Sequence, residues 1–281
     1  MPREANMAIF KIIKGTFHVK GYQPDGDSIR FRADNEAHWA FFPNADNDKK
    51  RQLRIEAIDA LETHYEGYHQ PLPFAISALE RLLAVIGIKN VKYSLSATHI
   101  VDADDATPGF IASAAMDRFS RPISFLFPPS ASLTDGAELD VDQLPLEQSV
   151  NYLLLREGLV YPTFYTSTEK PVLDKFRTAT ERARIAGRGL WAIDRTSDFT
   201  IWDTRTIQDS VMILPKLFRR LVGFFDRYQD FKELPAYMIK QRDDLQLVDN
   251  PMPRSLASLM TIKGRRLKLK VPVDDILFSP K

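Results

Sequence analysis

The chain has 281 residues, of which 44% are hydrophobic and 27% are charged, so it can bury one or two sizeable cores. Its 38 Lys and Arg residues and 37 Asp and Glu residues give a formal net charge of +1. This balance excludes a global positive field, so any binding of nucleic acid needs a local basic patch. The absence of cysteine excludes disulfides, cysteine zinc sites and a thiol nucleophile.

We recognise neither a signal peptide nor a membrane-spanning segment in this sequence. No apolar run reaches the roughly 18 residues that a membrane span needs, so we expect neither a span nor a membrane partner. Residues 1–14 carry charges around a short apolar run and show no small-residue cleavage site, unlike a signal peptide. We therefore expect a cytoplasmic protein.

Hydrophobic periodicity predicts strands first and helices later in the chain. Residues 8–33 alternate around the turn Pro24-Asp25-Gly26-Asp27, which indicates an antiparallel hairpin. The other expected elements, in chain order, are an elaborated hairpin or loop at 35–50, a strand at 53–58, a helix at 71–86, a strand at 91–101, an insert at 102–109, a strand at 123–127, and helices at 146–158 and 172–187. These elements predict an α+β fold, a five-stranded barrel capped by about three helices.

Acidic and basic residues with potential site chemistry fall in three short stretches. They are Asp25-Gly26-Asp27-Ser28, the segment from Arg54 through Asp59 to Glu62, and Asp117-Arg-Phe-Ser-Arg121. Carboxylates bind hard divalent cations, a carboxylate can direct a water molecule, and guanidiniums can hold a phosphate whose charge grows during attack. This combination is typical of a phosphodiester nuclease.

In this order and spacing, the three stretches resemble the staphylococcal (thermonuclease-like) nuclease family. The resemblance covers about residues 9–195 and is supported by Leu155-Arg-Glu-Gly-Leu159 and by the segment from Arg182 to Gly189-Leu190-Trp191. It implies an OB-fold barrel, with helices after the third and fifth strands. It also implies a hydrolase that cleaves DNA, RNA or both and leaves a 3′-phosphate.

The resemblance also implies roles for individual residues. Asp27 and Asp59 correspond to ligands of a Ca²⁺ ion, and the carbonyl of Ala60 is a further candidate ligand. Glu62 corresponds to the carboxylate that orients or deprotonates the attacking water. Arg54 and Arg121 correspond to the two arginines that hold the phosphate by bidentate hydrogen bonds, although other divalent ions remain alternatives to calcium. Asp25 either hydrogen-bonds a metal-bound water or simply closes the turn.

The sequence departs from the family pattern around the substrate. Arg118-Phe119-Ser120 stands where the family commonly has Lys-Tyr-Gly, so Arg118 and the ring of Phe119 are candidate substrate contacts. Leu61 replaces a proline often found before the glutamate. Three further aromatic residues are candidates either for stacking on bases or for simple packing over the barrel: Tyr161, Phe164 and Tyr165.

Each residue of the pattern also has a structural interpretation. Asp-Gly turns are common between strands for backbone reasons, and the charges around Arg54 and Glu56 could form a solvated edge. Glu62, His64, Glu66 and His69 suggest a transition-metal site, but a polar surface loop explains these residues more simply.

Beyond the resemblance, we expect a division into a nuclease-like domain, 1–198, and a C-terminal extension, 199–281. The extension has more basic than acidic residues. Residues 213–225 predict an amphipathic helix with Leu217, Leu221 and Phe225 toward a core and Lys216, Arg219 and Arg220 in water. We expect a connector at 243–253 and a strand or hairpin at 260–271, whose Lys263, Arg265, Arg266, Lys268 and Lys270 either contact phosphates or protect a sheet edge.

Three functional hypotheses follow. The first is a calcium-dependent endonuclease or other phosphodiesterase acting on DNA or RNA. The second is a non-catalytic OB-fold module that binds nucleic acid or protein. The third adds to the first an extension that restrains or recruits the enzyme, or that forms a homo-oligomer or binds a protein partner through residues 199–281.

Overall fold

The structure is a computed structural model that describes residues 8–43, 45, 48–95 and 99–280. Residues 1–7, which belong to the stretch judged for a signal peptide, lie outside the described residues, as do parts of the segments 35–50 and 91–101. The chain forms two compact units, each built from three stretches. Unit 1 comprises Met1–Glu56, Leu79–Leu154 and Glu169–Phe176, and unit 2 comprises Ala57–Ala78, Leu155–Thr168 and Arg177–Lys281.

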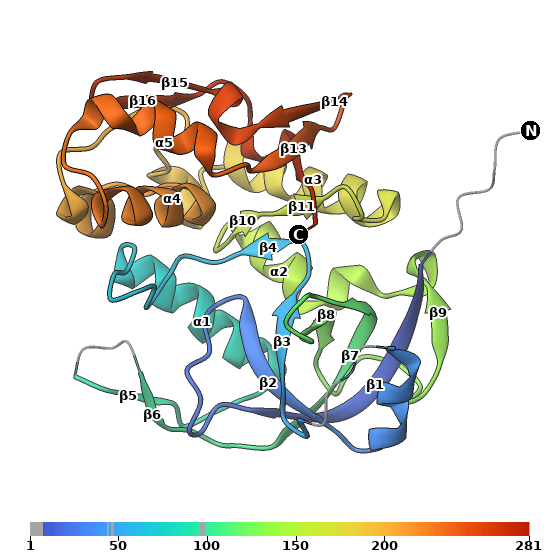
Figure 1. The fold of residues 1–281 in the computed structure, drawn as a ribbon. Helices are drawn as coiled ribbons and strands as arrows, with labels where there is room; N and C mark the ends of the chain where they lie inside the picture. Colours follow the sequence, from blue (N-terminus) through green and yellow to red (C-terminus); the bar gives the residue numbers. More distant parts are fainter. Residues whose placement is uncertain (1–7, 44, 46–47, 96–98, 281) are drawn as a thin grey trace, which may run out of the picture. The chain divides into compact units, whose positions relative to one another are not determined.

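Unit 1 contains a closed five-stranded barrel (Figure 1). Strand β3 runs parallel to β8, the other neighbouring pairs are antiparallel, and pairing of β2 with β1 closes the ring. A further short strand, β9 (Glu138–Asp140), pairs with residues 9–11 of β1, the end of that strand that does not pair with β2. The barrel strands are β1 (Ile9–His18), β2 (Ser28–Ala33), β3 (Arg51–Ile55), β7 (Thr107–Met116) and β8 (Pro122–Phe127).

Two glycines allow the barrel to close tightly. Gly15 of β1 lies directly opposite Gly109 of β7. A Cβ atom at Gly109 would come within 2.4 Å of the Phe17 ring, and one at Gly15 within 2.6 Å of the Phe31 ring. Both rings are fully buried and lie 5.1 Å apart in the barrel core. Only glycine leaves room for these rings under the curved strands.

Several predicted elements are confirmed in the described residues. They are the β1–β2 hairpin, strand β8, α1 (Leu72–Ile86), α2 (Val150–Glu157) and α3 (Lys170–Ile185). Glycines follow the last two helices, and Gly158 and Gly187 have φ angles of 71° and 59°. The closed barrel and the mixed α+β fold are confirmed as well.

The sequence-based prediction for the fourth barrel strand is wrong. In the described part of residues 91–101, only the small pair β5 (Lys92–Tyr93) and β6 (Ile100–Asp102) is extended. The barrel strand is instead β7, which begins inside the segment expected to be an insert. Its sequence, TPGFIASAAM, has few β-branched or aromatic residues, so local propensity does not reveal it. Pairing along both β1 and β8 stabilises it.

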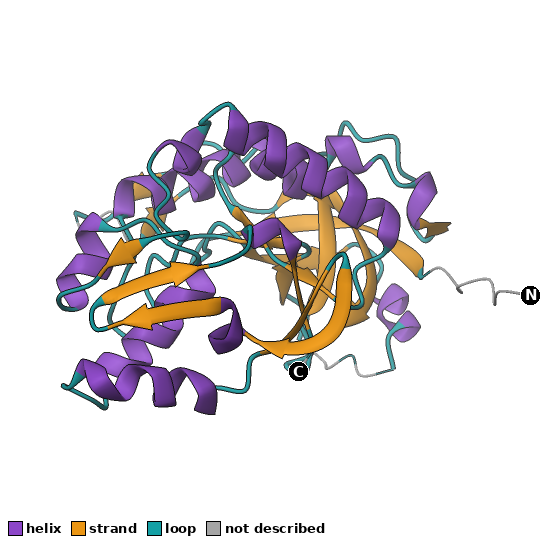
Figure 2. Cartoon of the chain, turned by 90° about the horizontal axis from the view of Figure 1, so that it is seen from above, coloured by secondary structure: helices purple, strands orange, loops and turns teal. Residues whose placement is uncertain are grey.

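Unit 2 has its own hydrophobic core. Leu61, Tyr161 and Trp191 pack in one buried cluster with residues that follow position 199. The α-helices that lie entirely within the described part of this unit are α4 (Pro215–Phe225) and α5 (Leu234–Lys240), labelled in Figure 1; Figure 2 colours all helices of the chain purple. Its strands are β4 (Ile58–Asp59), β10 (Tyr161–Pro162), β11 (Phe164–Tyr165), β12 (Phe199–Thr200), β13 (Asp244–Leu247), β14 (Asn250–Ser255), β15 (Met260–Lys263), β16 (Arg266–Leu269) and β17 (Ile276–Phe278).

The strands of unit 2 form small sheets. Strand β10 pairs with β4, and the longer orders are β11-β17-β13-β14 and β12-β16-β15. The helix at 213–225 and the hairpin at 260–271 are confirmed as α4 and β15–β16. The connector expected at 243–253 is wrong, because β13 and β14 form an antiparallel hairpin there. Compactness alone does not test the expected division at residue 198, which stays a prediction.

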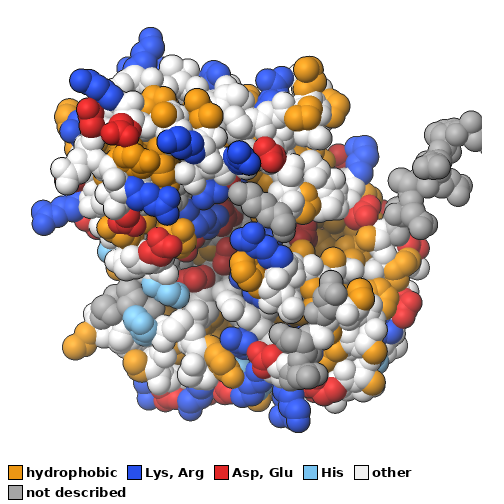
Figure 3. Space-filling view, viewed as in Figure 1, with side chains coloured by type: hydrophobic (Ala, Val, Ile, Leu, Met, Phe, Trp, Pro, Cys, Tyr) orange, Lys and Arg blue, Asp and Glu red, His pale blue; other side chains and the backbone are white. Residues whose placement is uncertain are grey.

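Within the described residues, no helix combines the length and apolar character needed to cross a membrane. On the face shown in Figure 3, basic and acidic side chains are interspersed, in keeping with the net charge of +1.

Short helical turns connect the longer elements in the described residues. They are Glu36–Phe41, Val141–Gln143, Leu146–Gln148, Gly189–Ala192, Thr206–Ser210, Phe231–Glu233, Leu256–Leu259 and Val273–Asp275.

Candidate functional site

Three of the predicted site residues meet at one end of the unit 1 barrel. Asp27 directly precedes β2, whose first residue, Ser28, lies opposite Arg54. The amide of Ile55 donates a 3.0 Å hydrogen bond to the carbonyl of Asp27. In the parallel pair of β3 and β8, Arg54 lies beside Ile123, two residues after Arg121. The start of β2, the end of β3 and the start of β8 therefore hold one acid and two arginines.

Arg121 is held by its own loop. The Asp117 carboxylate accepts from the amides of Phe119 at 2.9 Å and Arg121 at 3.0 Å, and from the Arg121 guanidinium through Nε at 2.8 Å and Nη2 at 2.7 Å. Burial acts to raise the pKa of Asp117, but the hydrogen bonds and charge of Arg121 outweigh it and lower this pKa. We call this arrangement the Asp117–Arg121 clasp. It orients the guanidinium before any ligand arrives.

A pocket of about 340 Å³ lies beside the clasp. Phe119 is 63% exposed, and the guanidinium carbons of Arg118 and Arg121 lie 4.7 and 5.5 Å from its ring centroid. A phosphate can bind to arginines here while a base stacks on the exposed ring. The pocket is lined by Arg30, Asp48, Arg51, Gln52, Phe119, Ser120 and Arg121.

Asn151, a residue that the sequence did not single out, fixes this end of the barrel. It is fully buried in α2, and its Nδ2 donates to the carbonyls of Glu56 at 2.8 Å and Ser124 at 3.1 Å. Its Oδ1 accepts from the amide of Leu126 at 3.1 Å. One carboxamide thus joins the segment after β3 to β8. No local pattern distinguishes such an asparagine from a polar residue on a helix surface.

The other predicted acids belong to unit 2. Asp59 ends β4 opposite Tyr161 of β10 and is only 4% exposed. Glu62 follows in a loop whose ends are joined by the amide of Gln70, which donates to the Glu62 carbonyl at 2.8 Å. The buried side chain of Gln70 also donates to the carbonyl of Ile213 at 2.8 Å. Asp59 and Glu62 are therefore both held by backbone contacts within unit 2.

Arg219 of α4 binds both acids. Its Nη2 donates to Oδ2 of Asp59 at 2.9 Å, and its Nη1 donates to Oδ1 at 3.1 Å. The same Nη1 forms an ion pair with Oε1 of Glu62. Burial acts to lower the pKa of Arg219, but the two carboxylates raise it further above its ordinary value. The expectation that Arg219 stays in water is wrong.

The other two basic residues of α4 are also partly buried. Arg220 forms an ion pair with Asp243, whose side chain is 1% exposed. The Lys216 ammonium lies 4.0 Å from the ring centroid of Phe278. Burial lowers the pKa of Lys216 to about 8, although Asp243 and Asp59 act against that shift. The amphipathic pattern did identify the core side of α4, where Leu217 and Leu221 are buried.

Two of the aromatic residues proposed to contact substrate are core residues. Tyr161 and Phe164 are fully buried in unit 2. Tyr161 packs edge-on against Trp191, with ring centroids 5.2 Å apart, and its hydroxyl donates to Asp194 at 2.5 Å. Tyr165 is partly buried near Phe278. This corrects the stacking role for Tyr161 and Phe164, because the sequence alone does not show which face of a short strand meets water.

The calcium hypothesis places carboxylate and carbonyl oxygens around the ion, and these are ligands that calcium prefers. In unit 2, however, the oxygens of Asp59 and Glu62 bind the Arg219 guanidinium. The described residues include no group of three or more His, Asp or Glu side chains placed to hold a metal. The donor chemistry suits calcium, but a divalent ion at Asp59 and Glu62 would have to compete with Arg219.

The alternative histidine site has other contacts. His64 shares a 2.7 Å hydrogen bond with the hydroxyl of Thr63, and His69 contacts the carbonyl of Gln70 at 3.1 Å. Tyr65 and Tyr68 pair across the tight turn between them. These contacts fit the simpler interpretation of residues 62–70 as a structured polar loop.

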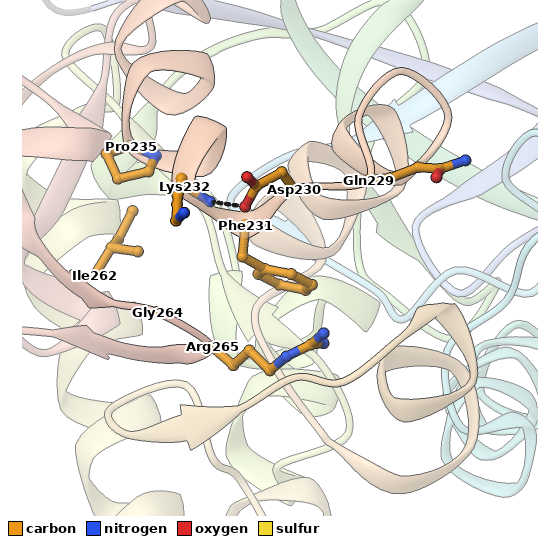
Figure 4. Close-up of a pocket in the computed structure, with 8 residues that line it drawn as sticks. All are labelled: Gln229, Asp230, Phe231, Lys232, Pro235, Ile262, Gly264 and Arg265. Carbon is orange, nitrogen blue, oxygen red and sulfur yellow. Dashed lines mark hydrogen bonds between the residues drawn. The ribbon is translucent and has the colours of Figure 1, made fainter.

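A second pocket, of about 580 Å³, lies in the C-terminal part of unit 2 (Figure 4). Phe231 and Arg265 lie side by side, with the guanidinium carbon 4.3 Å from the ring centroid. Among the described residues lining the pocket, none belongs to the predicted nuclease site, although Arg265 is one of the hairpin residues considered for phosphate contact. They are Gln229, Asp230, Phe231, Lys232, Pro235, Ile262, Gly264 and Arg265.

The basic residues of the C-terminal hairpin mostly have partners within unit 2. Arg266 and Lys268 both form ion pairs with Asp198, at 2.6 and 2.8 Å. Lys270 donates to the carbonyl of Ser258, and Arg265 to that of Trp202. These contacts favour the interpretation of the hairpin as a protected edge over that of a phosphate-binding arm.

No protein-family model matches the sequence, and no curated protein is significantly similar to it. The function is therefore inferred from the residues of the chain itself.

Proposed function

We propose that this protein is a nuclease that hydrolyses phosphodiester bonds in DNA or RNA. The observation that carries the proposal is the convergence of Asp27, Arg54 and Arg121 at one end of the unit 1 barrel. The two arginines lie 67 positions apart in the sequence, yet Arg54 is near the end of β3 and Arg121 directly precedes its neighbour β8. Two guanidiniums beside an acid suit a phosphate whose negative charge increases during attack.

The order of the barrel strands supports an OB-fold. Numbered along the chain among the barrel strands alone, the closed ring reads 1-2-3-5-4-1, with the third and fifth strands parallel. Helix α1 follows the third barrel strand and α2 follows the fifth. A five-stranded barrel of this kind is a recurrent platform for oligonucleotides.

The backbone conformation of Ser120 also supports the resemblance to the staphylococcal nuclease family. It stands where that family commonly has glycine, and its φ angle of 58° lies in the left-handed region that glycine adopts most easily. The turn is held by the Asp117 carboxylate, which receives both neighbouring amides. The backbone thus has the form expected for the family's glycine although the residue is serine.

In the proposed reaction, a water oxygen attacks phosphorus while the Glu62 carboxylate accepts a proton from that water. Arg54 and Arg121 donate hydrogen bonds to the non-bridging phosphate oxygens, whose charge rises. The bond from phosphorus to the 5′ oxygen breaks, its electron pair stays on that oxygen, and a solvent proton neutralises it. The products are a 3′-phosphate and a 5′-hydroxyl.

The proposal requires Arg54 and Glu62 to act on one phosphate. Asp27, Asp59 and the Ala60 carbonyl are the proposed calcium ligands, and a bound divalent ion would supply positive charge beside the phosphate.

A cleavage assay tests this function. Labelled single- and double-stranded DNA and RNA are incubated with calcium, magnesium, manganese or chelator, and the ends of the products are identified. We expect metal-dependent cleavage that Glu62→Gln abolishes while Glu66→Gln, a change at a nearby exposed acid, leaves it intact. Arg54→Lys and Arg121→Lys should lower the rate far more than Arg32→Lys at an exposed position of β2. Full activity in excess chelator would contradict the proposal.

A second function is favoured by the occupation of Asp59 and Glu62 by Arg219. With these acids held by a guanidinium, unit 1 could serve as a module that binds single strands through its arginines and Phe119. This alternative predicts oligonucleotide binding that depends on Arg121 and Phe119, with no cleavage under any metal condition.

A further inference from the structure

Arg219 reaches Asp59 and Glu62 from a well-anchored helix. Helix α4 begins with Pro215, and Leu217, Phe218, Leu221 and Val222 are all at most 1% exposed. Its polar side is held as well, because Arg220 binds Asp243 through Nε at 2.7 Å. The guanidinium is therefore placed by a packed element and not by a freely moving surface side chain.

The contact has the geometry of a specific ion-binding arrangement. Both oxygens of Asp59 receive a separate N–H of Arg219, and Glu62 receives a third hydrogen bond. The exposed fractions of the side chains are 6% for Asp59, 14% for Glu62 and 27% for Arg219. Charges this far from water interact more strongly than surface pairs do, and they need a partner.

One guanidinium does not neutralise two carboxylates. The three side chains together carry a formal charge of −1, which would attract a cation. A divalent ion would nevertheless have to approach the oxygens already bound by Arg219 and would be repelled by the guanidinium itself. Release of Arg219 would leave two adjacent carboxylates with hard oxygen ligands, the donor type that calcium prefers.

We propose that Arg219 is the resident cation of the Asp59–Glu62 pair and that a divalent ion binds there only by displacing it. Helix α4 thereby controls access of metal to these acids. Where it describes the restraint of a nuclease, the inference rests on the proposed function. The binding of metal can nevertheless be measured without catalysis.

Calorimetric titration with calcium, in parallel with thermal unfolding, tests the proposal on the full chain. Arg219→Gln removes the positive charge but keeps a polar side chain. Arg220→Gln is the matched control, because it removes the neighbouring arginine of the same helix and also breaks a buried ion pair. We expect Arg219→Gln to bind calcium at least about tenfold more tightly than the wild-type chain, while Arg220→Gln binds like wild type.

The thermal measurements should separate the same variants. Each substitution is expected to lower the unfolding temperature, because each removes a guanidinium that is paired with a buried carboxylate. Calcium should restore the temperature of Arg219→Gln but not of Arg220→Gln, relative to sodium chloride of equal ionic strength. Adding Asp59→Asn to Arg219→Gln should cancel the gain in calcium affinity, which locates the bound ion at Asp59.

Equal calcium affinities for wild type and Arg219→Gln would overturn the proposal. If Arg219→Gln does not fold even with calcium, Arg219→Lys provides the comparison, because lysine keeps the charge but loses the bidentate fork. Tighter calcium binding by Arg219→Lys supports displacement, and unchanged binding overturns it.

Cleavage by the same variants separates this inference from the proposed function. If Arg219→Gln gains calcium affinity and no variant cleaves nucleic acid, the proposed function fails and the role of Arg219 stands. If the wild-type chain cleaves and Arg219→Gln shows neither tighter calcium binding nor a lower calcium requirement, the nuclease stands and the role of Arg219 fails.

Discussion

Tyr161 lies directly opposite Asp59 in the antiparallel pair of β10 and β4. Its ring is buried against Trp191 and its hydroxyl donates to Asp194, which also accepts from the amide and hydroxyl of Thr196. The tyrosine thus fixes the strand that presents the acid and has no exposed surface of its own.

Tyr161→Phe should therefore destabilise the chain without changing how it binds nucleic acid. Loss of a hydrogen bond to a carboxylate costs about 1.5–3 kcal/mol of folding free energy. Chemical unfolding measures this loss. Fluorescence anisotropy with a labelled single-stranded oligonucleotide, in chelator, should give the wild-type affinity, and a large drop in affinity would restore the stacking role.

Phe119→Leu should show the opposite behaviour. The ring is 63% exposed, so its loss should have little effect on folding, whereas a lost base stack is worth about 1–3 kcal/mol of binding free energy. We expect the affinity for single strands to fall about fivefold or more in the same anisotropy assay. An unchanged affinity would show that bases do not meet this ring.

Asn151→Ala should disturb the end of the barrel that carries Arg54 and Arg121. The change leaves the amide of Leu126 and the carbonyls of Glu56 and Ser124 without their side-chain partner, at an expected cost of about 2–4 kcal/mol. Unfolding by urea measures the loss. Gln148→Ala, at an exposed position just before α2, is the matched control and should cost less than about 0.5 kcal/mol.

Lys216 should make folding stability depend on pH in the alkaline range. Burial lowers its pKa from 10.5 to about 8 in the folded chain, so between these pH values the unfolded chain holds a proton that the folded chain has released. The free energy of unfolding therefore rises with pH across this window. Lys216→Met should be more stable than wild type at pH 7 and lose that advantage toward pH 10.5, as measured by thermal unfolding.

The matched control for that experiment is Lys240→Met, since Lys240 is exposed at the end of α5. It should leave the pH profile of the wild-type chain unchanged. A profile for Lys216→Met that runs parallel to wild type at every pH would show that Lys216 stays fully solvated.

Asp117 should make folding stability depend on pH in the acidic range. Its pKa is lowered in the folded chain, so the stability that it contributes is complete above its unfolded pKa, near 3.8, and is lost as pH falls through the folded value. The stability difference between wild type and Asp117→Asn should be constant above about pH 5 and shrink below about pH 4. A difference that grows on acidification would contradict this role.

Helical elements with a regular apolar pattern were the easiest to predict. The stripes of α1, α3 and α4 are visible in sequence because each helix buries one side, and the β1–β2 hairpin shows a clear turn. Strand β7 was missed because its small residues have little intrinsic preference for extended structure. The β13–β14 hairpin was missed because its Asp, Asn and Pro residues resemble a loop.

The candidate site was predictable only in part. The pattern of acids and arginines is local enough to be noticed, and unit 1 brings Asp27, Arg54 and Arg121 to one place. Arg219 could not be anticipated, because a charged residue on an amphipathic helix is usually solvated and its partner Asp59 lies 160 positions away. Contacts over such separations depend on tertiary packing, which a single sequence does not show.

The hydrophobic core of unit 2 contains residues from before and after position 199, which affects any experiment with a truncated chain. Leu61, Tyr161 and Trp191 are covered by side chains that follow position 199, including those of α4. Removing residues 200–281 would expose these apolar groups to water and invite aggregation. The C-terminal third thus contributes to the hydrophobic core of its unit, so single substitutions on α4 are the sounder way to probe it.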